Sequence, residues 1–450
     1  MSAAASLPRS SLNTRAVAEA AKAAARVLAP TDEAKRNTAL EAMAAALESA
    51  GAELLAANAE DVQAAGTELS AATLARLKMD AAKLAEMAEQ VRSVAGLPDP
   101  LGRVLDAIEL DEGLGLTKVA VPLGVIAVIF EARPDAVTQI AALAVKSGNA
   151  VILKAGREVE RTAAALVGVL RGALRAVGLP EDAVSLVMGR ERAQELLAMH
   201  GLVDLVIPRG SKELVEYVQA NTRIPVLGHA EGVCHIYVDE RADEALALRV
   251  IEDAKVDYPA ACNAVETVLV HRGIAAEFLP KLAERLRANG VALHGDETVR
   301  ELLRGVEVEA VEDWHREYGE LALSLGVVGS MDEAMEHIHA HGSAHTESIL
   351  TEDAAAAERF LREVDAASVM HNASTRFADG FRYGFGAEVG ISTSKLHARG
   401  PVGLEGLTTY KYLLRGHGQV AGDYRVSKET GKAGETGLAA RVFTHRRETR

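Results

Sequence analysis

The chain has 450 residues, of which 49% are hydrophobic and 25% are charged, and its formal net charge is −15 at pH 7. This length suits two or three domains that each bury a core, so no disulfide or metal is required for stability. The acidic balance disfavours nonspecific binding to nucleic acid, because such binding needs a basic face against the phosphates.

The sequence shows no targeting or membrane signal. Its first ten residues contain no apolar segment typical of a secretory signal. The longest apolar run, Val119–Phe130, contains Pro122 and Gly124 and is shorter than the ~20 residues that span a bilayer. The two cysteines, Cys234 and Cys262, fit a reducing compartment better than a disulfide. We therefore expect a cytoplasmic protein with no membrane partner.

Two kinds of local structure precede the first motif. Residues 11–100 are alanine-rich and carry apolar residues at a helical period, which predicts two to four helices. Residues 104–121 place apolar runs on either side of Asp111-Glu112-Gly113, which predicts a β-hairpin. Neither segment carries a catalytic signal.

From Gly124 onward the sequence alternates between short Val/Ile/Leu runs and helical segments. This rhythm predicts parallel sheets with helices on both faces, in two domains that divide near residue 230. We expect strands at 125–130, 150–154, 184–188, 202–207, 226–227, 235–238 and 265–270, and helices at 136–146, 158–176, 243–256 and 275–289. Residues 420–450 are polar and rich in glycine and charge, which predicts a flexible tail.

The strongest chemical signal is a cysteine in a loop of small residues, Asp257-Tyr258-Pro259-Ala260-Ala261-Cys262-Asn263. Small neighbours leave the sulfur of Cys262 room to meet a substrate, where its thiolate would act as a nucleophile. A buried, inert cysteine is the competing interpretation. Cys234 precedes an apolar strand, and for it we favour core packing.

Two turns at the ends of predicted strands suit anionic ligands. Gly210 and Ser211 follow Ile207-Pro208-Arg209 and open a helix, whose first N–H groups can bind a phosphate. An ordinary strand–helix turn with Ser211 as N-cap explains the pattern equally well. Lys154-Ala155-Gly156-Arg157 ends another strand, where open α/β sheets bind ligands, and a solvated basic turn is its alternative.

The region from Asn372 to Gly403 is rich in polar residues and glycine, which favours a ligand-binding lid over a merely irregular connection. No glycine fingerprint for dinucleotides, no P-loop and no paired-cysteine metal motif occurs. The histidines between residues 337 and 345 match no metal-binding spacing, so we expect a solvated helix end there and no metal.

Taken in order, these stretches resemble the gamma-glutamyl phosphate reductases of the aldehyde dehydrogenase superfamily. The resemblance covers about residues 11–419, and the ordered set of segments is more specific than any one of them. The matching segments are Pro122-Leu123-Gly124-Val125-Ile126, Phe130-Glu131-Ala132-Arg133-Pro134, 146–153, 207–211, 225–229, Tyr258-Pro259-Ala260-Ala261-Cys262-Asn263, Asn372-Ala373-Ser374-Thr375-Arg376-Phe377 and 384–403.

That resemblance implies an aldehyde-dehydrogenase-like α/β fold with three parts. A Rossmann-type cofactor domain would comprise residues 1–103 and 122–230, and an α/β catalytic domain would comprise residues 231–400. Residues 104–121 and 401–419 would form a small β element for oligomerisation, so we expect a homo-oligomer.

The resemblance also assigns residues to a cofactor. Lys154 is similar to the lysine that holds the adenine ribose, and Gly210 and Ser211 match the turn beside the pyrophosphate. Glu317 is a weaker match to the glutamate on the nicotinamide ribose. Arg157 stands where NAD-dependent relatives tend to carry an acid, and its guanidinium would pair with a ribose 2′-phosphate. We therefore expect NADP as the cofactor.

Two departures from aldehyde-oxidising relatives concern hydrolysis. Those relatives carry a water-activating glutamate near Gly228 and an oxyanion asparagine near Ala132. This sequence has Leu227-Gly228-His229 and Glu131-Ala132-Arg133 instead. Loss of the base suits an enzyme whose acyl acceptor is phosphate, because hydrolysis would destroy the thioester.

The resemblance thus implies reduction of L-glutamyl 5-phosphate by NADPH to L-glutamate 5-semialdehyde and phosphate, in proline biosynthesis. Cys262 would form the thioester. Its backbone N–H and the side chain of a nearby Asn or Arg, for which we name Asn263, would hold the oxyanion.

Further groups would bind the substrate. Arg133 or Arg376 would hold its phosphate, and Glu131 with Asn372 and the rest of the lid would hold its amino-acid end. Glutamate 5-kinase is an expected partner that would hand over the labile acyl phosphate. Two alternatives stay open at this point, namely a non-phosphorylating aldehyde dehydrogenase and a catalytically silent binding protein of the same fold.

Overall fold

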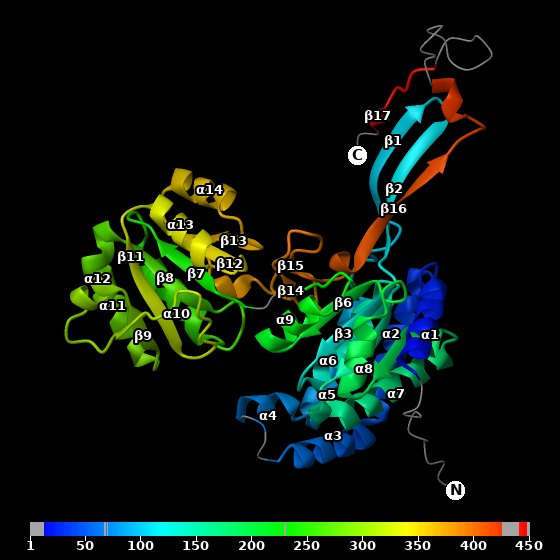
Figure 1. Cartoon of the computed structure of the whole chain (residues 1–450), viewed down its shortest axis with the longest axis horizontal. Coiled ribbons are helices and arrows are strands. Elements are labelled where there is room, and N and C mark those ends of the chain that lie inside the picture. Colours follow the sequence, from blue (N-terminus) through cyan, green and yellow to red (C-terminus); the bar gives the residue numbers. More distant parts are fainter. Residues whose placement is uncertain (1–12, 67–68, 70, 229–230, 425–440, 448–450) are drawn as a thin grey trace.

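The computed structural model describes residues 13–66, 69, 71–228, 231–424 and 441–447. Two α/β bodies stand side by side, and a narrow β-sheet projects away from the first of them (Figure 1). The predicted α/β class is confirmed. Among the described helices, none has both the length and the apolar character that crossing a membrane would require.

The first body is built on a four-stranded parallel sheet in the order β5-β4-β3-β6. All residues of its central strand β3 are buried, as expected for a strand covered by helices. Its elements are β3 (Val125–Phe130), α6 (Pro134–Lys146), β4 (Ala150–Ala155), α7 (Glu160–Ala176), β5 (Val184–Val187), α8 (Arg190–Leu197), β6 (Leu205–Arg209) and α9 (Lys212–Ala220). The predicted short strand at 226–227 is a single bridge between Val206 and Val226.

Five described helices precede this sheet, where we predicted two to four. They are α1 (Thr14–Leu28), α2 (Glu33–Ser49), α3 (Gly51–Ala65), α4 (Ala71–Leu77) and α5 (Ala81–Ala95). The breaks fall at capping residues that the alanine-rich pattern hides. The side chains of Asn13, Asp32 and Asp80 each accept a backbone N–H in the first turn of the helix that follows.

The second body contains a seven-stranded parallel sheet in the order β10-β9-β11-β8-β7-β12-β13. Its predicted first four elements are confirmed as β7, α10, β8 and α11 with small shifts of their ends. The elements are β7 (Cys234–Val238), α10 (Glu244–Val256), β8 (Val265–His271), α11 (Arg272–Ala288), β9 (Ala292–Gly295), α12 (Glu297–Leu302), β10 (Glu309–Ala310), β11 (Ala322–Val328), α13 (Met331–His341), β12 (Thr346–Leu350), α14 (Ala354–Glu363) and β13 (Ser368–His371).

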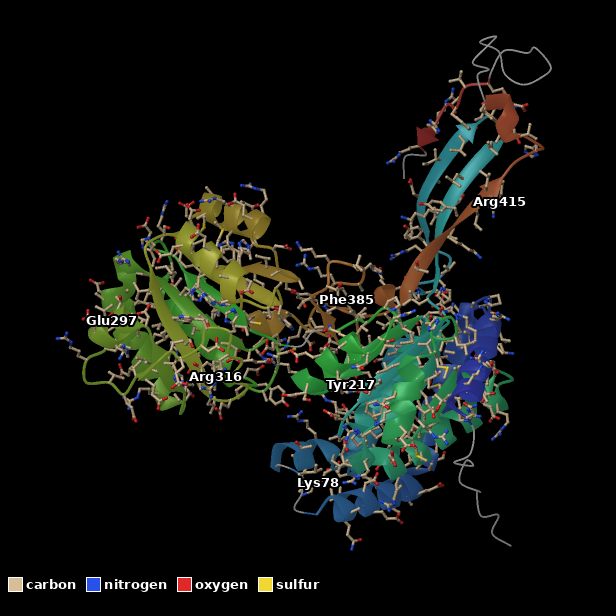
Figure 2. All side chains as sticks on the ribbon, viewed as in Figure 1. Lys78, Tyr217, Glu297, Arg316, Phe385 and Arg415 are labelled. Carbon is tan, nitrogen blue, oxygen red and sulfur yellow. The ribbon has the colours of Figure 1, made fainter. Side chains whose placement is uncertain are left out.

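The segment after β13 returns to the first body. It carries the short strands β14 (Ile391–Ser392) and β15 (Gly400–Pro401) and passes between the two bodies, where Phe385 lies (Figures 1 and 2). Ala387, Val389 and Ala398 belong to the hydrophobic core of the first body. We predicted that the second domain continues to residue 400. That boundary is wrong, because these apolar side chains are buried against the other body.

The projecting sheet is antiparallel, with strands in the order β16-β2-β1-β17. Its strands are β1 (Val104–Asp111), β2 (Leu114–Pro122), β16 (Thr408–Arg415) and β17 (Arg446–Arg447). The hairpin at 104–121 and the strand in 401–419 therefore form one element, as predicted (Figure 1). Its role in oligomerisation stays a prediction.

Part of the C-terminal tail is bound to this sheet. Arg446 pairs with Glu109 of β1, the Thr444 N–H donates to the Leu110 carbonyl at 2.8 Å, and Arg441 forms an ion pair with Asp111 at 2.7 Å. The prediction of a flexible tail over 420–450 is therefore wrong for residues 441–447. Residues 425–440 and 448–450 lie outside the described part of the chain.

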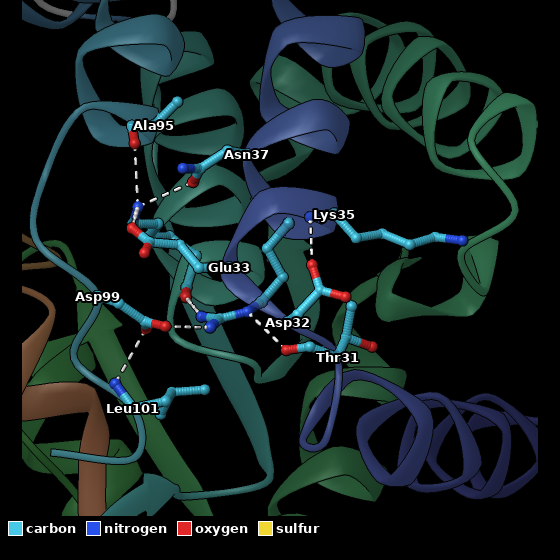
Figure 3. A network of polar contacts seen from close by, with 10 residues as sticks. Thr31, Asp32, Glu33, Lys35, Asn37, Ala95, Asp99 and Leu101 are labelled. Atoms are coloured by element: carbon cyan, nitrogen blue, oxygen red, sulfur yellow. Dashed lines mark hydrogen bonds and ion pairs between the residues drawn. The ribbon is translucent and has the colours of Figure 1, made fainter.

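A buried lysine joins the N-terminal helices to the first sheet's α6. The Lys146 ammonium is fully buried and donates to Glu33 Oε1 at 2.9 Å, Asn37 Oδ1 at 2.8 Å and the Ala95 carbonyl at 2.9 Å (Figure 3). All three donors of the ammonium are satisfied, which is the condition for burying a charge at tolerable cost.

Arg36 extends this network. Its buried guanidinium donates to the Thr31 carbonyl at 3.1 Å, to Asp99 Oδ2 at 2.6 Å and to the Lys146 carbonyl. Because the Asp99 carboxylate also accepts the Leu101 N–H at 3.0 Å, the network reaches the chain that leads into the projecting sheet (Figure 3).

Replacing Lys146 by Met should lower the free energy of unfolding by about 2–4 kcal/mol, because it leaves Asn37 Oδ1 and the Ala95 carbonyl unpaired. Urea unfolding followed by circular dichroism measures the change. Lys35→Met is the matched control, since its side chain is exposed (Figure 3), and its effect should stay within about 0.5 kcal/mol. Equal losses in both variants would contradict a stabilising role for the network.

Candidate active site

The predicted cofactor residues lie along one edge of the first sheet, at the carboxyl ends of β4, β3 and β6. Lys154 is opposite Ile129 in the sheet, and its side chain is half-buried. Arg157 follows as the exposed first residue of the 3₁₀ turn Arg157–Val159. Ligands of open α/β sheets bind at this edge, so the positions suit a nucleotide.

Gly210 and Ser211 form the turn that opens α9. The Ser211 N–H donates to Glu131 Oε2 at 3.2 Å, and a Cβ on Gly210 would lie 2.5 Å from the same oxygen. Glycine is therefore needed for the close approach of this carboxylate to the helix N-terminus, where a negative charge is favoured. We predicted that Glu131 holds the substrate's amino-acid end. The structure places it on the Gly210-Ser211 turn instead.

The Glu158 carboxylate fixes the loop that carries Glu131 and Arg133. Ala132 adopts a φ of +44°, and its N–H donates to Glu158 Oε1 at 2.6 Å. The same oxygen would lie 2.0 Å from a Cβ on Gly156. The lack of a side chain at Gly156 therefore leaves the space that the Glu158 carboxylate occupies. Sequence reasoning missed Glu158, although it follows directly on the basic turn singled out there.

Cys262 lies in a tight loop between α10 and β8. The loop is closed by backbone hydrogen bonds from Ala261 to Tyr258 at 3.1 Å and from Ala264 to Ala261 at 2.9 Å. Gly232 packs on it so closely that a Cβ there would lie 2.0 Å from the Cys262 carbonyl oxygen. The Cys262 side chain is only half-buried, which disagrees with the alternative of an inert core cysteine.

Cys234 is the second free cysteine, and it is buried as expected. Its Sγ donates to the Cys262 carbonyl at 3.3 Å. Burial, together with the Glu347 carboxylate, raises the pKa of the Cys234 thiol well above its usual range. The group therefore stays protonated and supports the backbone of the Cys262 loop.

Arg376 clamps both ends of the Cys262 loop. Its Nε donates to Asp257 Oδ2 at 3.2 Å, and its Nη1 donates to Asn263 Oδ1. Arg382 also donates to Asp257 Oδ2, at 3.0 Å. The Arg382 and Arg376 guanidinium groups hold the pKa of Asp257 below its usual value, so the carboxylate stays charged and the clamp persists at neutral pH.

This clamp changes the roles we predicted for two residues. Arg376 is buried and engaged with Asp257 and Asn263, so the structure does not place it on the substrate. Asn263 is buried as well, and its Nδ2 donates to the Ala378 carbonyl at 2.9 Å. Both side chains position the loop that carries the thiol. Sequence reasoning missed Asp257 and Arg382, because nothing local signals an ion pair across more than 100 residues.

Glu317 lies beside the same loop. Its Oε2 accepts the Gly232 N–H at 3.0 Å, next to the Cys262 backbone. The predicted cofactor residue is thus close to the predicted nucleophile, which suits a role near the reacting end of a cofactor.

A buried ion pair supports the loop of Glu317. Lys255 Nζ and Glu266 Oε2 lie 2.7 Å apart with almost no exposure, and Glu266 Oε1 accepts the Gly319 N–H at 3.3 Å. Burial raises the pKa of Glu266 to about 7, against the opposing pull of Lys255. Sequence reasoning missed this pair, whose members lie on α10 and β8.

The Asn372 side chain is engaged with the chain that follows β12. It has a φ of +52°, and its side-chain amide exchanges hydrogen bonds with the backbone of Thr351, at 3.0 Å from the Thr351 N–H and 3.1 Å to the Thr351 carbonyl. The amide continues the pairing of β12 and β13 beyond their ends. The prediction that Asn372 binds substrate is therefore not supported by its contacts.

We predicted a solvated helix end for the histidines between residues 337 and 345, and this does not describe all of them. The His337 ring packs edge-on against Trp314 at 4.7 Å and lies 4.6 Å from the His341 ring. Burial lowers the pKa of His337 to about 3. His345 is fully buried. Among the described residues, no group of three or more His, Cys, Asp or Glu side chains is arranged to hold a metal ion.

Comparison with known proteins fits this arrangement. The model of the aldehyde dehydrogenase family matches residues 7–301. A gamma-glutamyl phosphate reductase from Synechococcus sp. (strain JA-2-3B'a(2-13)) is 53% identical over 95% of this chain and 92% of its own, and one from Natronomonas pharaonis is 52% identical over 91% and 95%. The chain belongs to the aldehyde dehydrogenase family and, within it, to the gamma-glutamyl phosphate reductases.

Solved structures agree with the fold. The crystal structure of a gamma-glutamyl phosphate reductase from Thermotoga maritima superimposes with a TM-score of 0.88 at 41% identity, over 90% of this chain and 99% of that one. An acetylating aldehyde dehydrogenase from Geobacillus thermoglucosidasius shares the fold at 20% identity, with a TM-score of 0.65 over 90% and 97% of the two chains. The predicted aldehyde-dehydrogenase-like fold is confirmed.

Replacing Arg376 by Lys should lower kcat by about 10-fold or more, because a point charge cannot bridge Asp257 and Asn263 and the thiol loses its fixed place. KM for the aldehyde should change less than about threefold. Steady-state kinetics, with Arg362→Lys as an exposed control, measure both constants. A rise in KM at constant kcat would instead show that Arg376 binds substrate.

Proposed function

We propose that this protein reduces L-glutamyl 5-phosphate to L-glutamate 5-semialdehyde and phosphate, as a step of proline biosynthesis. The name of its relatives describes reduction of this acyl phosphate. The observation that carries the proposal is the half-buried Cys262 thiol, which sits in a loop fixed from both ends by Arg376.

The Cys262 thiolate attacks the acyl carbon, so that a C–S bond forms and the C–O bond to phosphate breaks with its electron pair on the phosphate. We propose that the Cys262 backbone N–H stabilises the oxyanion that develops at this carbon. When bound, the nicotinamide supplies the hydride that reduces the thioester to the aldehyde level.

The residues of the first sheet fit a nicotinamide cofactor, which this family uses. Lys154 stands at the carboxyl end of β4, and the turn that opens α9 lies at the same edge of the sheet. Glu317, which lies beside the Cys262 loop, is the candidate residue for binding the nicotinamide ribose. We propose NADP rather than NAD, because Arg157 presents an exposed guanidinium at this edge.

Three further proposals follow from the enzyme class. A catalytic thiol works only where it stays reduced, which supports the cytoplasm as its location. The projecting sheet exposes Tyr410, Tyr412 and Leu414 along β16, which supports a role in homo-oligomer formation. Glutamate 5-kinase is the proposed donor of the labile acyl phosphate.

Replacing Arg157 by Gln should raise KM for NADPH by about 10- to 100-fold, because a charge-assisted contact with the 2′-phosphate is lost. The kcat/KM with NADH should change less than about twofold. Parallel initial-rate assays with the two reduced cofactors measure this. Equal losses with both cofactors would contradict a 2′-phosphate site.

The function itself is tested in the oxidative direction, with glutamate 5-semialdehyde, inorganic phosphate and NADP followed by nicotinamide absorbance. Turnover should require phosphate, and Cys262→Ser should lower kcat by about 1,000-fold or more, since the covalent route is removed.

Two results would overturn this proposal in different ways. Turnover by the wild type without phosphate would identify a non-phosphorylating aldehyde dehydrogenase. No turnover, together with no protection of Cys262 from alkylation by NADPH, would identify a silent binding protein. Alkylation reports on Cys262 because Cys234 is buried.

A further inference from the structure

Arg209 is the last residue of β6 and lies at the same edge of the first sheet as the cofactor turn. It is opposite Phe130 in the sheet, and its carbonyl accepts the Glu131 N–H at 3.2 Å. Its side chain is half-buried beneath the returning segment. A Cβ on Gly390, which has a φ of +151°, would lie 2.5 Å from Arg209 Nη1. Glycine at 390 therefore makes the space for this guanidinium.

The charges around Arg209 join the two bodies. Burial lowers the pKa of its guanidinium, and repulsion from Arg133 lowers it further, whereas Glu388, Cys262 and Asp135 raise it. The charge of Arg209 thus interacts with Arg133 of the first body and with Cys262, the predicted nucleophile, of the second. Arg133 lies in the loop after β3, so the two arginines come from neighbouring strand ends.

Within the described part of the chain, neither arginine forms an ion pair, although Glu388 and Asp135 act on Arg209 through longer-range attraction. Among the residues that the structure describes, no carboxylate or carbonyl accepts a hydrogen bond from the side chain of Arg209. The same holds for the side chain of Arg133. The nearby Glu388 carboxylate accepts the Gly380 N–H at 2.9 Å. Two like charges that are partly removed from water and left without a partner destabilise a fold, unless an anion binds between them.

The position of Cys262 indicates which anionic group of the substrate would bind to these arginines, namely the phosphate. In the acyl phosphate, the phosphate is bonded to the carbon that the thiolate attacks, so it must lie close to the sulfur. A guanidinium binds phosphate through two parallel hydrogen bonds, which a lone lysine cannot do. Arg376, our earlier candidate for this group, is engaged with Asp257 and Asn263.

We propose that Arg209, together with Arg133, binds the phosphate of the acyl phosphate and takes up the charge of the departing phosphate dianion. This inference rests on the proposed function. In the reductive direction the C–O bond breaks and its electron pair goes to the phosphate held by the arginines. In the oxidative direction the same site binds inorganic phosphate, whose oxygen attacks the thioester and displaces the Cys262 thiolate.

Varying inorganic phosphate in the oxidative assay tests the site with the full chain. Arg209→Gln should raise KM for phosphate by about 10- to 100-fold. KM for NADP and KM for the semialdehyde should change less than about threefold. Arg209→Lys should show an intermediate rise, since it keeps the charge and loses the two-pronged contact. Arg249→Gln, on the exposed face of α10, should behave like the wild type.

A pre-steady-state burst separates this inference from the proposed function. Without phosphate, both the wild type and Arg209→Gln should form one equivalent of NADPH per active site, because acylation of Cys262 precedes phosphate attack. A burst in both proteins with an unchanged KM for phosphate would overturn the role of Arg209 alone. No burst and no phosphate dependence in the wild type would overturn the proposed function.

Two other outcomes also count against the site. A raised KM for NADP alone would show that Arg209 binds the cofactor's pyrophosphate, and a raised KM for the semialdehyde alone would show that it binds the substrate's carboxylate. As a measurement that does not depend on turnover, inorganic phosphate should raise the Tm of the wild type and not that of Arg209→Gln. Equal shifts in both proteins would contradict the proposal.

Discussion

The ion pair between Arg376 and Asp257 is the contact on which the arrangement of the site depends. Arg376 follows β13, whereas Asp257 and Asn263 bound the loop between α10 and β8, so one guanidinium fixes that loop from both ends. A loop of small residues has little packing of its own. Without an outside clamp, the sulfur of Cys262 would not keep one position relative to a substrate.

The return of the chain to the first body provides the second constraint. Ala387, Val389 and Ala398 are buried in the core of the first body, although most of the preceding 150 residues belong to the second. This crossing brings Gly390 onto Arg209 and holds the two bodies at the edge where β3, β4 and β6 end. Apolar burial, which is not directional, therefore brings the parts of the proposed site together, and charged hydrogen bonds, which are directional, orient them.

Negative and positive charge are separated along this edge of the first sheet. Glu131 occupies the N-terminus of α9, whereas Arg133 and Arg209 leave positive charge on the side of Cys262. A thiol that expels phosphate needs cations near the leaving group and no base that would activate water. The absence of a glutamate in Leu227-Gly228 agrees with this requirement, and His229 lies outside the described residues.

The sequence by itself determined the features that depend on neighbours in the chain. The apolar run 125–130 is rich in Val and Ile and follows a glycine, which indicates a buried strand, and Cys262 among alanines indicates either a reachable thiol or a small core residue. The tertiary structure decided which interpretation of Cys262 is correct and which side chains are in contact. Arg376 and Asn372 both lie in a polar, glycine-rich stretch, yet one clamps the Cys262 loop and the other pairs with Thr351. Such contacts join residues far apart in the chain, and local sequence carries the type of each side chain but not the distance to its partner.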